Sequence, residues 1–179
     1  MKYSFVIILL IALSFLGCEK DDICSNDTPT TPSLIIRFYD VTNPNTDVLN
    51  SVTNLRIQGI GNDDVLPDYD VVATDSIAVP LKTTDNVTQY SLYKEYVYDD
   101  NDTPDDDSDD TVTGNEDVIT ITYDMEEVYV SRACGYKTVY RNVSINLVED
   151  DDNWIQLIRS VNDNQSVEDE NEVQFKLYH

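Results

Sequence analysis

The 179-residue chain contains one histidine, His179, and only five glycines. Serine and cysteine nucleophiles need a histidine base, and histidine-rich zinc sites need several imidazoles, so neither kind of centre can be assembled inside the domain. The glycines are scattered and form no phosphate-binding loop. The sequence therefore predicts that the protein is not an enzyme. A pair of carboxylates, as used in glycoside hydrolysis, is the alternative that stays open.

Positive charge is also scarce, with 11 Lys and Arg against 35 Asp and Glu and a net charge of −24 at pH 7. Nucleic-acid binding requires clustered Lys and Arg that displace counterions, so nucleic acid is excluded as a partner. The same charge opposes adsorption of the whole protein to anionic headgroups, and a covalent lipid would have to hold it at a membrane.

Helical periodicity is missing: no apolar repeat at three-and-four spacing extends over more than two turns. Short segments rich in Val, Ile, Thr and Tyr instead alternate with polar turns, which is typical of strands. The pattern predicts an all-β antiparallel β-sandwich, immunoglobulin-like or jelly-roll-like, with a barrel as the alternative. The expected strands are 34–39, 55–60, 76–81, 88–98, 118–123, 127–132, 138–148, 154–161 and 173–178.

The one long apolar run, Phe5 to Leu16, follows Lys2, as in a secretory signal. It is shorter than the roughly 20 residues that span a bilayer. Phe15-Leu16-Gly17-Cys18 resembles the lipobox of bacterial lipoproteins. That resemblance implies a signal peptide over residues 1–17 and a lipid anchor, carrying fatty acids such as palmitate, on Cys18.

Residues 18–33 are expected to be a lipidated tether, followed by a single domain over residues 34–179. Lys20-Asp21-Asp22 resembles the surface-export signal of Bacteroidota lipoproteins. The resemblance implies an outer-membrane protein that faces the cell surface. The alternative is a charged tether that carries no export signal.

Two cysteines remain once Cys18 carries a lipid, namely Cys24 and Cys134. Beyond the inner membrane the surroundings are oxidising, so the two thiols are expected to form a disulfide.

The segment Asp99–Asp117 is predicted to be a long acidic loop exposed to solvent. No cofactor is expected, with Ca²⁺ as the one alternative, because oxygen-bearing side chains fall at positions one, three, five, seven and twelve of a calcium loop. Position six is Asp110, where that motif has glycine. The candidate ligands are Asp105, Asp107, Asp109, Thr111 and Glu116.

Four tyrosines between residues 90 and 98 could form a platform for sugar rings, although packing in the core or at its rim is the main expectation. They are Tyr90, Tyr93, Tyr96 and Tyr98. Asp75-Ser76-Ile77 and Asp110-Thr111-Val112 resemble the acceptor triplet of Bacteroidota O-glycosylation, which marks Ser76 and Thr111 as candidate acceptors.

Five linked motifs resemble a family of flavobacterial lipoproteins of unknown function. They are CEKDDIC at 18–24, TPTTP at 28–32, LIIRFYD at 34–40, VYVSRACGYK at 128–137 and NWI at 153–155. The resemblance implies location and architecture but supplies no activity. We therefore expect a surface-exposed outer-membrane lipoprotein whose non-catalytic β-sandwich is a binding or structural module for a protein or glycan partner. A carboxylate-dependent enzyme acting on cell-surface glycans is the alternative.

Overall fold

The computed structural model describes residues 24–25, 28 and 30–179. The expected signal peptide, Cys18 and the Lys20-Asp21-Asp22 motif lie outside these residues. The described part of the chain has no helix long and apolar enough to cross a membrane. It consists of nine strands: β1 (Leu34–Tyr39), β2 (Val52–Gly59), β3 (Val72–Thr74), β4 (Ser76–Val79), β5 (Val87–Asp99), β6 (Thr111–Ser131), β7 (Gly135–Leu147), β8 (Leu157–Ser160) and β9 (Phe175–Tyr178).

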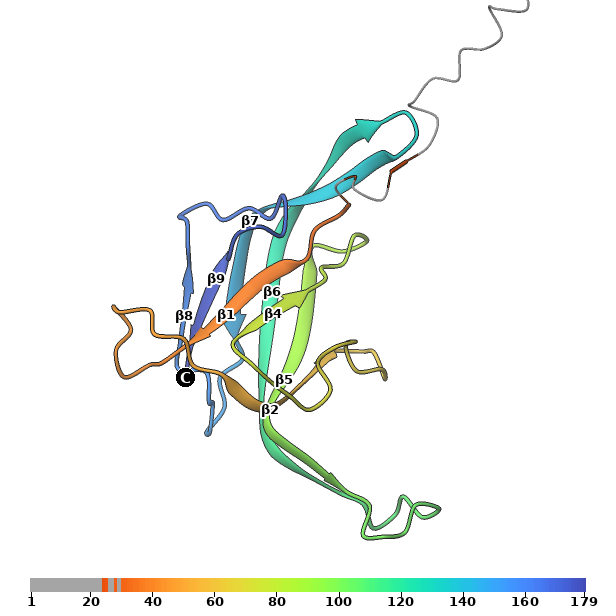
Figure 1. Ribbon diagram of the computed structural model, residues 1–179, viewed down its shortest axis with the longest axis vertical. Helices are drawn as coiled ribbons and strands as arrows, with labels where there is room; N and C mark the ends of the chain where they lie inside the picture. The colour runs from red at the N-terminus through yellow and green to blue at the C-terminus, as the bar shows by residue number, and fades with distance from the viewer. Residues whose placement is uncertain (1–23, 26–27, 29) are drawn as a thin grey trace, which may run out of the picture.

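The strands form two sheets, which confirms the predicted all-β sandwich and removes the barrel alternative (Figure 1). One sheet has the order β4-β1-β9-β8, and the other has the order β3-β2-β5-β6-β7. All pairs are antiparallel except β1 and β9, which run parallel with Ile36 opposite Phe175. The predicted antiparallel sandwich thus contains one parallel pair, which alternation does not reveal because it does not report the direction of a neighbouring strand.

Alternation along the strands builds the core between the sheets. In β1 the side chains of Leu34, Ile36 and Phe38 are completely buried, while Arg37 between them is exposed. The same period of two buries Ile119 and Ile121 on β6. Burying each such side chain stabilises the fold by roughly 1.5–3 kcal/mol relative to an exposed one. The apolar residues seen in the sequence therefore become the contact face of the sandwich.

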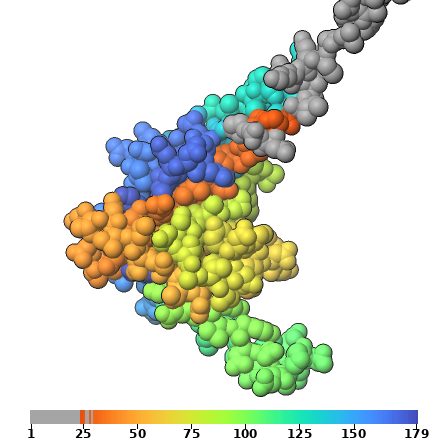
Figure 2. All heavy atoms as spheres, viewed as in Figure 1, coloured from red at the N-terminus to blue at the C-terminus, as the bar shows by residue number. Residues whose placement is uncertain are grey.

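Two hairpins extend beyond the sandwich at opposite ends of the long axis of the molecule (Figures 1 and 2). The acidic arm comprises residues 97–113, with Val97 paired to Thr113 and the loop 100–110 at its tip. The tether arm comprises residues 127–138, where β6 pairs with β7. It lies at the end of the molecule where Cys24 is found.

The acidic loop is shorter than expected, because β6 begins at Thr111 and runs unbroken to Ser131. The expected strands 118–123 and 127–132 are therefore one strand, with a register shift between Thr122 and Asp124. The β-branched residues of Thr111-Val112-Thr113 favour the pleated conformation, which extends the strand into the acidic segment. Gly114 is needed there: its φ is +131°, and a Cβ would lie 3.0 Å from the Tyr96 Cα.

Candidate binding groove

Three buried tyrosines hold the segment Pro80–Lys82, which connects β4 to β5. The Tyr140 hydroxyl donates to the Leu81 carbonyl at 2.9 Å, and the Tyr123 hydroxyl donates to the Lys82 carbonyl at 2.9 Å. The Tyr90 hydroxyl donates to the Pro80 carbonyl. Three successive carbonyls thus each accept a hydrogen bond from a different strand of the five-stranded sheet. We call these three side chains the tyrosine clamp.

Each tyrosine of the clamp places an apolar ring in the core and a hydroxyl at its edge. Tyr140 is completely buried, and its ring packs edge-on against that of Tyr123 with centroids 4.9 Å apart. Burial raises the pKa of Tyr140 to about 12, and burial also raises the pKa of Tyr90 and of Tyr123. All three hydroxyls therefore keep their protons at neutral pH and remain donors to the 80–82 backbone.

A groove with a volume of about 780 Å³ lies beside the clamped segment. Gly59 at the end of β2, the turn that follows it and the start of β5 complete its walls. The turn is itself hydrogen-bonded, since Ile60 N–H donates to the Gln89 carbonyl at 3.0 Å and Leu66 N–H donates to the Ile57 carbonyl at 2.9 Å. Both sides of the groove are thus fixed by backbone hydrogen bonds before any ligand arrives, as in most small-ligand sites.

The groove is lined by both apolar and polar side chains. Ile60, Leu66 and Leu81 contribute apolar surface, and Ile60 is 45% exposed. Lys82 is exposed and lines the groove, and it forms no ion pair within the described part of the chain. Asp64 is the single carboxylate among the described lining residues. The arrangement can therefore bind an apolar segment with an acceptor near Lys82, but this lining lacks the carboxylate pair of glycoside hydrolases.

A family model matches residues 54–179, and its description is a family of unknown function, DUF6452. The chain belongs to this family. The matched region of DUF6452 contains the groove, the tyrosine clamp and Cys134, whereas β1 and Cys24 precede it. Neither the search of curated proteins nor that of solved structures found a match.

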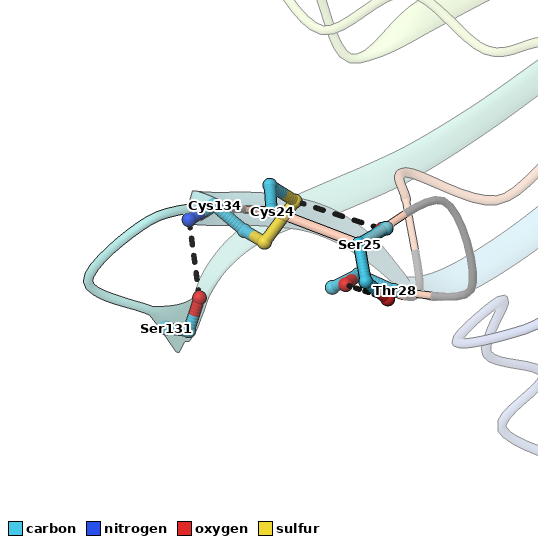
Figure 3. The surroundings of a disulfide bond; sticks show 5 residues. All are labelled: Cys24, Ser25, Thr28, Ser131 and Cys134. Carbon is cyan, nitrogen blue, oxygen red and sulfur yellow. Dashed lines mark hydrogen bonds between the residues drawn. A yellow bond between two sulfur atoms is a disulfide. The ribbon is translucent and has the colours of Figure 1, made fainter. Parts of the chain in front are cut away.

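Within the DUF6452 chain the disulfide expected between Cys24 and Cys134 is present (Figure 3). The two Cα atoms lie 4.9 Å apart, within the usual range for a disulfide. Cys134 lies in the turn of the tether arm, where its N–H donates to the Ser131 hydroxyl at 3.1 Å. The bridge therefore attaches the chain at residue 24 to the end of this arm.

The five candidate calcium ligands are not brought together. Thr111 and Glu116 both lie on β6, so their Cα atoms are about 16 Å apart at the usual rise per strand residue. Within the described ranges no group of three or more His, Cys, Asp or Glu side chains is placed to hold a metal ion. Calcium binding stays the untested alternative to the expectation of no cofactor, and a calcium titration of the purified protein would test it.

The four candidate tyrosines of β5 do not share one surface. Tyr90 belongs to the clamp, while Tyr96 is buried beneath the Arg56 guanidinium, 4.7 Å from its ring centroid. Tyr93 packs edge-on against Tyr96, with ring centroids 5.5 Å apart. Tyr98 is exposed on the acidic arm and donates to the Asp110 carboxylate. They serve packing and hydrogen bonding rather than a common platform.

The two candidate O-glycosylation residues differ in accessibility. Ser76 is half-buried on β4, and its N–H donates to the Thr74 hydroxyl at 3.1 Å. Thr111 is exposed at the start of β6. Modification of either residue stays a prediction, and mass spectrometry of glycopeptides from the native protein is its test.

Sequence reasoning missed Asp117, the buried carboxylate of the domain. It is completely buried and accepts hydrogen bonds from Asn153 Nδ2 at 3.1 Å, Trp154 N–H at 3.3 Å and Ile155 N–H at 2.7 Å. Burial raises its pKa above the ordinary value, and these hydrogen bonds oppose that rise. A signal was present, because alternation from Ile119 backwards places residue 117 on the buried face.

Proposed function

We propose that this member of DUF6452 is a lipoprotein of the outer membrane whose β-sandwich faces the cell surface as a non-catalytic binding module. The observation that carries the proposal is Cys18, which ends an apolar leader in a lipobox-like setting. The Lys20-Asp21-Asp22 motif and the resemblance to flavobacterial lipoproteins support the location. The Cys24–Cys134 disulfide supports an oxidising compartment, because such bridges are rare in the cytosol.

The groove supports binding as the role of the domain. The tyrosine clamp fixes one of its walls and backbone hydrogen bonds of the turn after β2 fix the other, so a ligand does not have to order them, and this lowers the entropic cost of binding. The lining favours an apolar segment of a protein or glycan partner, with an acceptor near Lys82. Asp64 alone does not supply the acid and base of carboxylate catalysis, which favours binding over turnover.

Cell fractionation followed by protease treatment of intact cells tests the location. We expect the native protein in the membrane fraction and its domain to be digested from outside. Cys18→Ala should leave the membrane fraction, because the charge of the domain opposes adsorption to headgroups. Alanine at Lys20, Asp21 and Asp22 together should keep the protein in the membrane but protect it from protease.

The outcomes of this experiment separate its two parts. Membrane retention of the Cys18→Ala protein would contradict the lipid anchor. Equal protection of the native protein and the triple-alanine variant in intact cells would place the domain in the periplasm and contradict the surface location.

Screening the purified protein against arrays of surface glycans and of peptides tests the groove. Ile60→Trp would fill the groove, and we expect it to abolish binding of any ligand that the native protein retains. Val161→Trp is the matched control, because Val161 is 44% exposed and lies outside the groove. If both variants lose binding equally, or if both retain it, the groove is not the binding site. Reproducible turnover of a glycan would favour an enzyme instead.

A further inference from the structure

The tether arm carries an exposed pair of aromatic side chains. Tyr129 on β6 and Tyr136 on β7 are opposite one another in the hairpin, with ring centroids 5.4 Å apart. Their exposed fractions, 58% and 66%, are the highest among the large hydrophobic side chains of the described residues. The arm extends beyond the sandwich, so these rings contribute nothing to its core (Figure 1).

The charge of this arm differs from that of the rest of the protein. No Asp or Glu occurs from Val128 to Val148, although the chain has 35 acidic residues. The arm contains Arg132 and Lys137, of which Arg132 is exposed, against a single acid, Glu127, at its base. At the opposite end the acidic arm carries eight Asp residues between 99 and 110. A phospholipid surface that contains anionic headgroups would therefore repel one end of the molecule and tolerate the other.

Covalent connectivity keeps the tether arm close to the expected lipid. Cys24 is bonded to Cys134 in the turn of the arm (Figure 3). Cys18 precedes Cys24 by six residues, which reach at most about 22 Å when fully extended. Tyr136 follows Cys134 by two residues. The aromatic pair is thus held near the attachment point of the lipid, whatever path the intervening chain takes.

We infer that the tether arm is a second membrane contact, in which Tyr129 and Tyr136 enter the headgroup region of a phospholipid bilayer beside the lipid on Cys18. This inference rests on the proposed lipid anchor. Tyrosine suits such a position because its ring is apolar and its hydroxyl prefers water, as in the aromatic belts of membrane proteins. The contact orients the domain, so that the acidic arm points away from the membrane.

Fluorescence of the lipidated full-length protein in vesicles tests the inference. The vesicles consist of phosphatidylethanolamine and phosphatidylglycerol whose acyl chains carry bromine near the headgroup. Tyr136→Trp introduces a reporter on the tether arm, and we expect the brominated lipid to quench most of the emission that this tryptophan adds. Tyr129→Trp repeats the measurement on the other strand. Trp154 is buried in the domain and provides the same background in every variant.

Tyr98→Trp is the matched control, because Tyr98 is 55% exposed and belongs to the acidic arm, on the other side of the sandwich from the tether arm. Its added emission should be unaffected by brominated lipid. Flotation of the vesicles reports separately whether the lipid anchor holds each variant. If both arm variants float but are quenched no more than Tyr98→Trp, the membrane contact is overturned while the lipid anchor stands. If no variant floats, the lipid anchor is wrong and the inference falls with it.

Discussion

Replacing Cys134 with serine should lower the free energy of unfolding more than any other single change considered for this protein. The disulfide joins residues that are 110 apart in sequence. In the chain-entropy model, closing a loop of this length restricts the unfolded chain by roughly 4–5 kcal/mol, an upper figure because native strain and residual structure usually reduce it. Urea denaturation of the native protein and of Cys134→Ser measures the difference.

Two further variants show whether the bridge itself is responsible for that loss. Cys24→Ser should cost the same free energy, and the double variant should cost no more than either single one, because each removes the same bond. Ala133→Ser changes the neighbouring residue of the same turn and keeps the disulfide, so its effect should stay within about 0.5 kcal/mol. Two thiols that react with an alkylating agent in the folded, never-reduced protein would contradict the bridge.

Asp117→Ala should be the second most destabilising change, at about 3 kcal/mol or more. Two buried donors, the N–H groups of Trp154 and Ile155, lose their acceptor, and each unsatisfied donor costs about 1–3 kcal/mol; the Asn153 amide also loses this bond but keeps the Val148 carbonyl as acceptor. The loss also releases the segment that carries Trp154, whose indole N–H donates to the Leu92 carbonyl at 3.2 Å. Asp124→Ala is the control on the same strand, because Asp124 is exposed, and it should cost under about 0.5 kcal/mol.

The pH dependence of stability provides an independent check on Asp117. Because burial raises its pKa in the folded protein above the ordinary 3.8, the folded state holds this proton to higher pH than the unfolded state does. The stabilisation that comes from protonated Asp117 is therefore fully present when the pH is below the ordinary pKa. It is lost as the pH rises through the raised pKa of the folded protein. Asp117→Asn cannot titrate, so the stability difference between native protein and variant should narrow as pH rises above 3.8. A difference that widens over this window would contradict the raised pKa.

Alternation predicted most of the strands, although it missed β3 and divided β6 into two strands. Leu34, Ile36 and Phe38 alternate along one predicted strand, and Phe175 and Leu177 along another, and all five lie in the core. The disulfide was also predictable, because two cysteines remained once Cys18 was assigned to a lipid and an oxidising compartment was expected. These inferences succeed because they depend on local periodicity or on composition, both of which are visible without knowing which strands are neighbours.

The candidate groove could not be predicted in the same way. The tyrosine clamp joins Tyr140 to Leu81 across 59 positions and Tyr123 to Lys82 across 41. Each tyrosine was recognisable as a strand residue with an apolar ring and a polar hydroxyl. The carbonyl that accepts the hydrogen bond of that hydroxyl depends on the order of the strands in the sheets. In the same way Asp117 differs from the neighbouring acids only because Trp154 and Ile155, distant in sequence, bring their N–H groups to it.

The sequence by itself therefore determined the strand composition, the buried faces, the cysteine pair and the difference in charge between the two arms. Only the tertiary structure decided the parallel pairing of β1 with β9, the burial of Asp117 and the three tyrosine hydroxyls that hold one wall of the groove in place. The physical reason is the range of the interactions. Side-chain alternation and net charge are local or additive properties, whereas a buried polar group is stabilised only by partners that the whole fold brings within hydrogen-bonding distance.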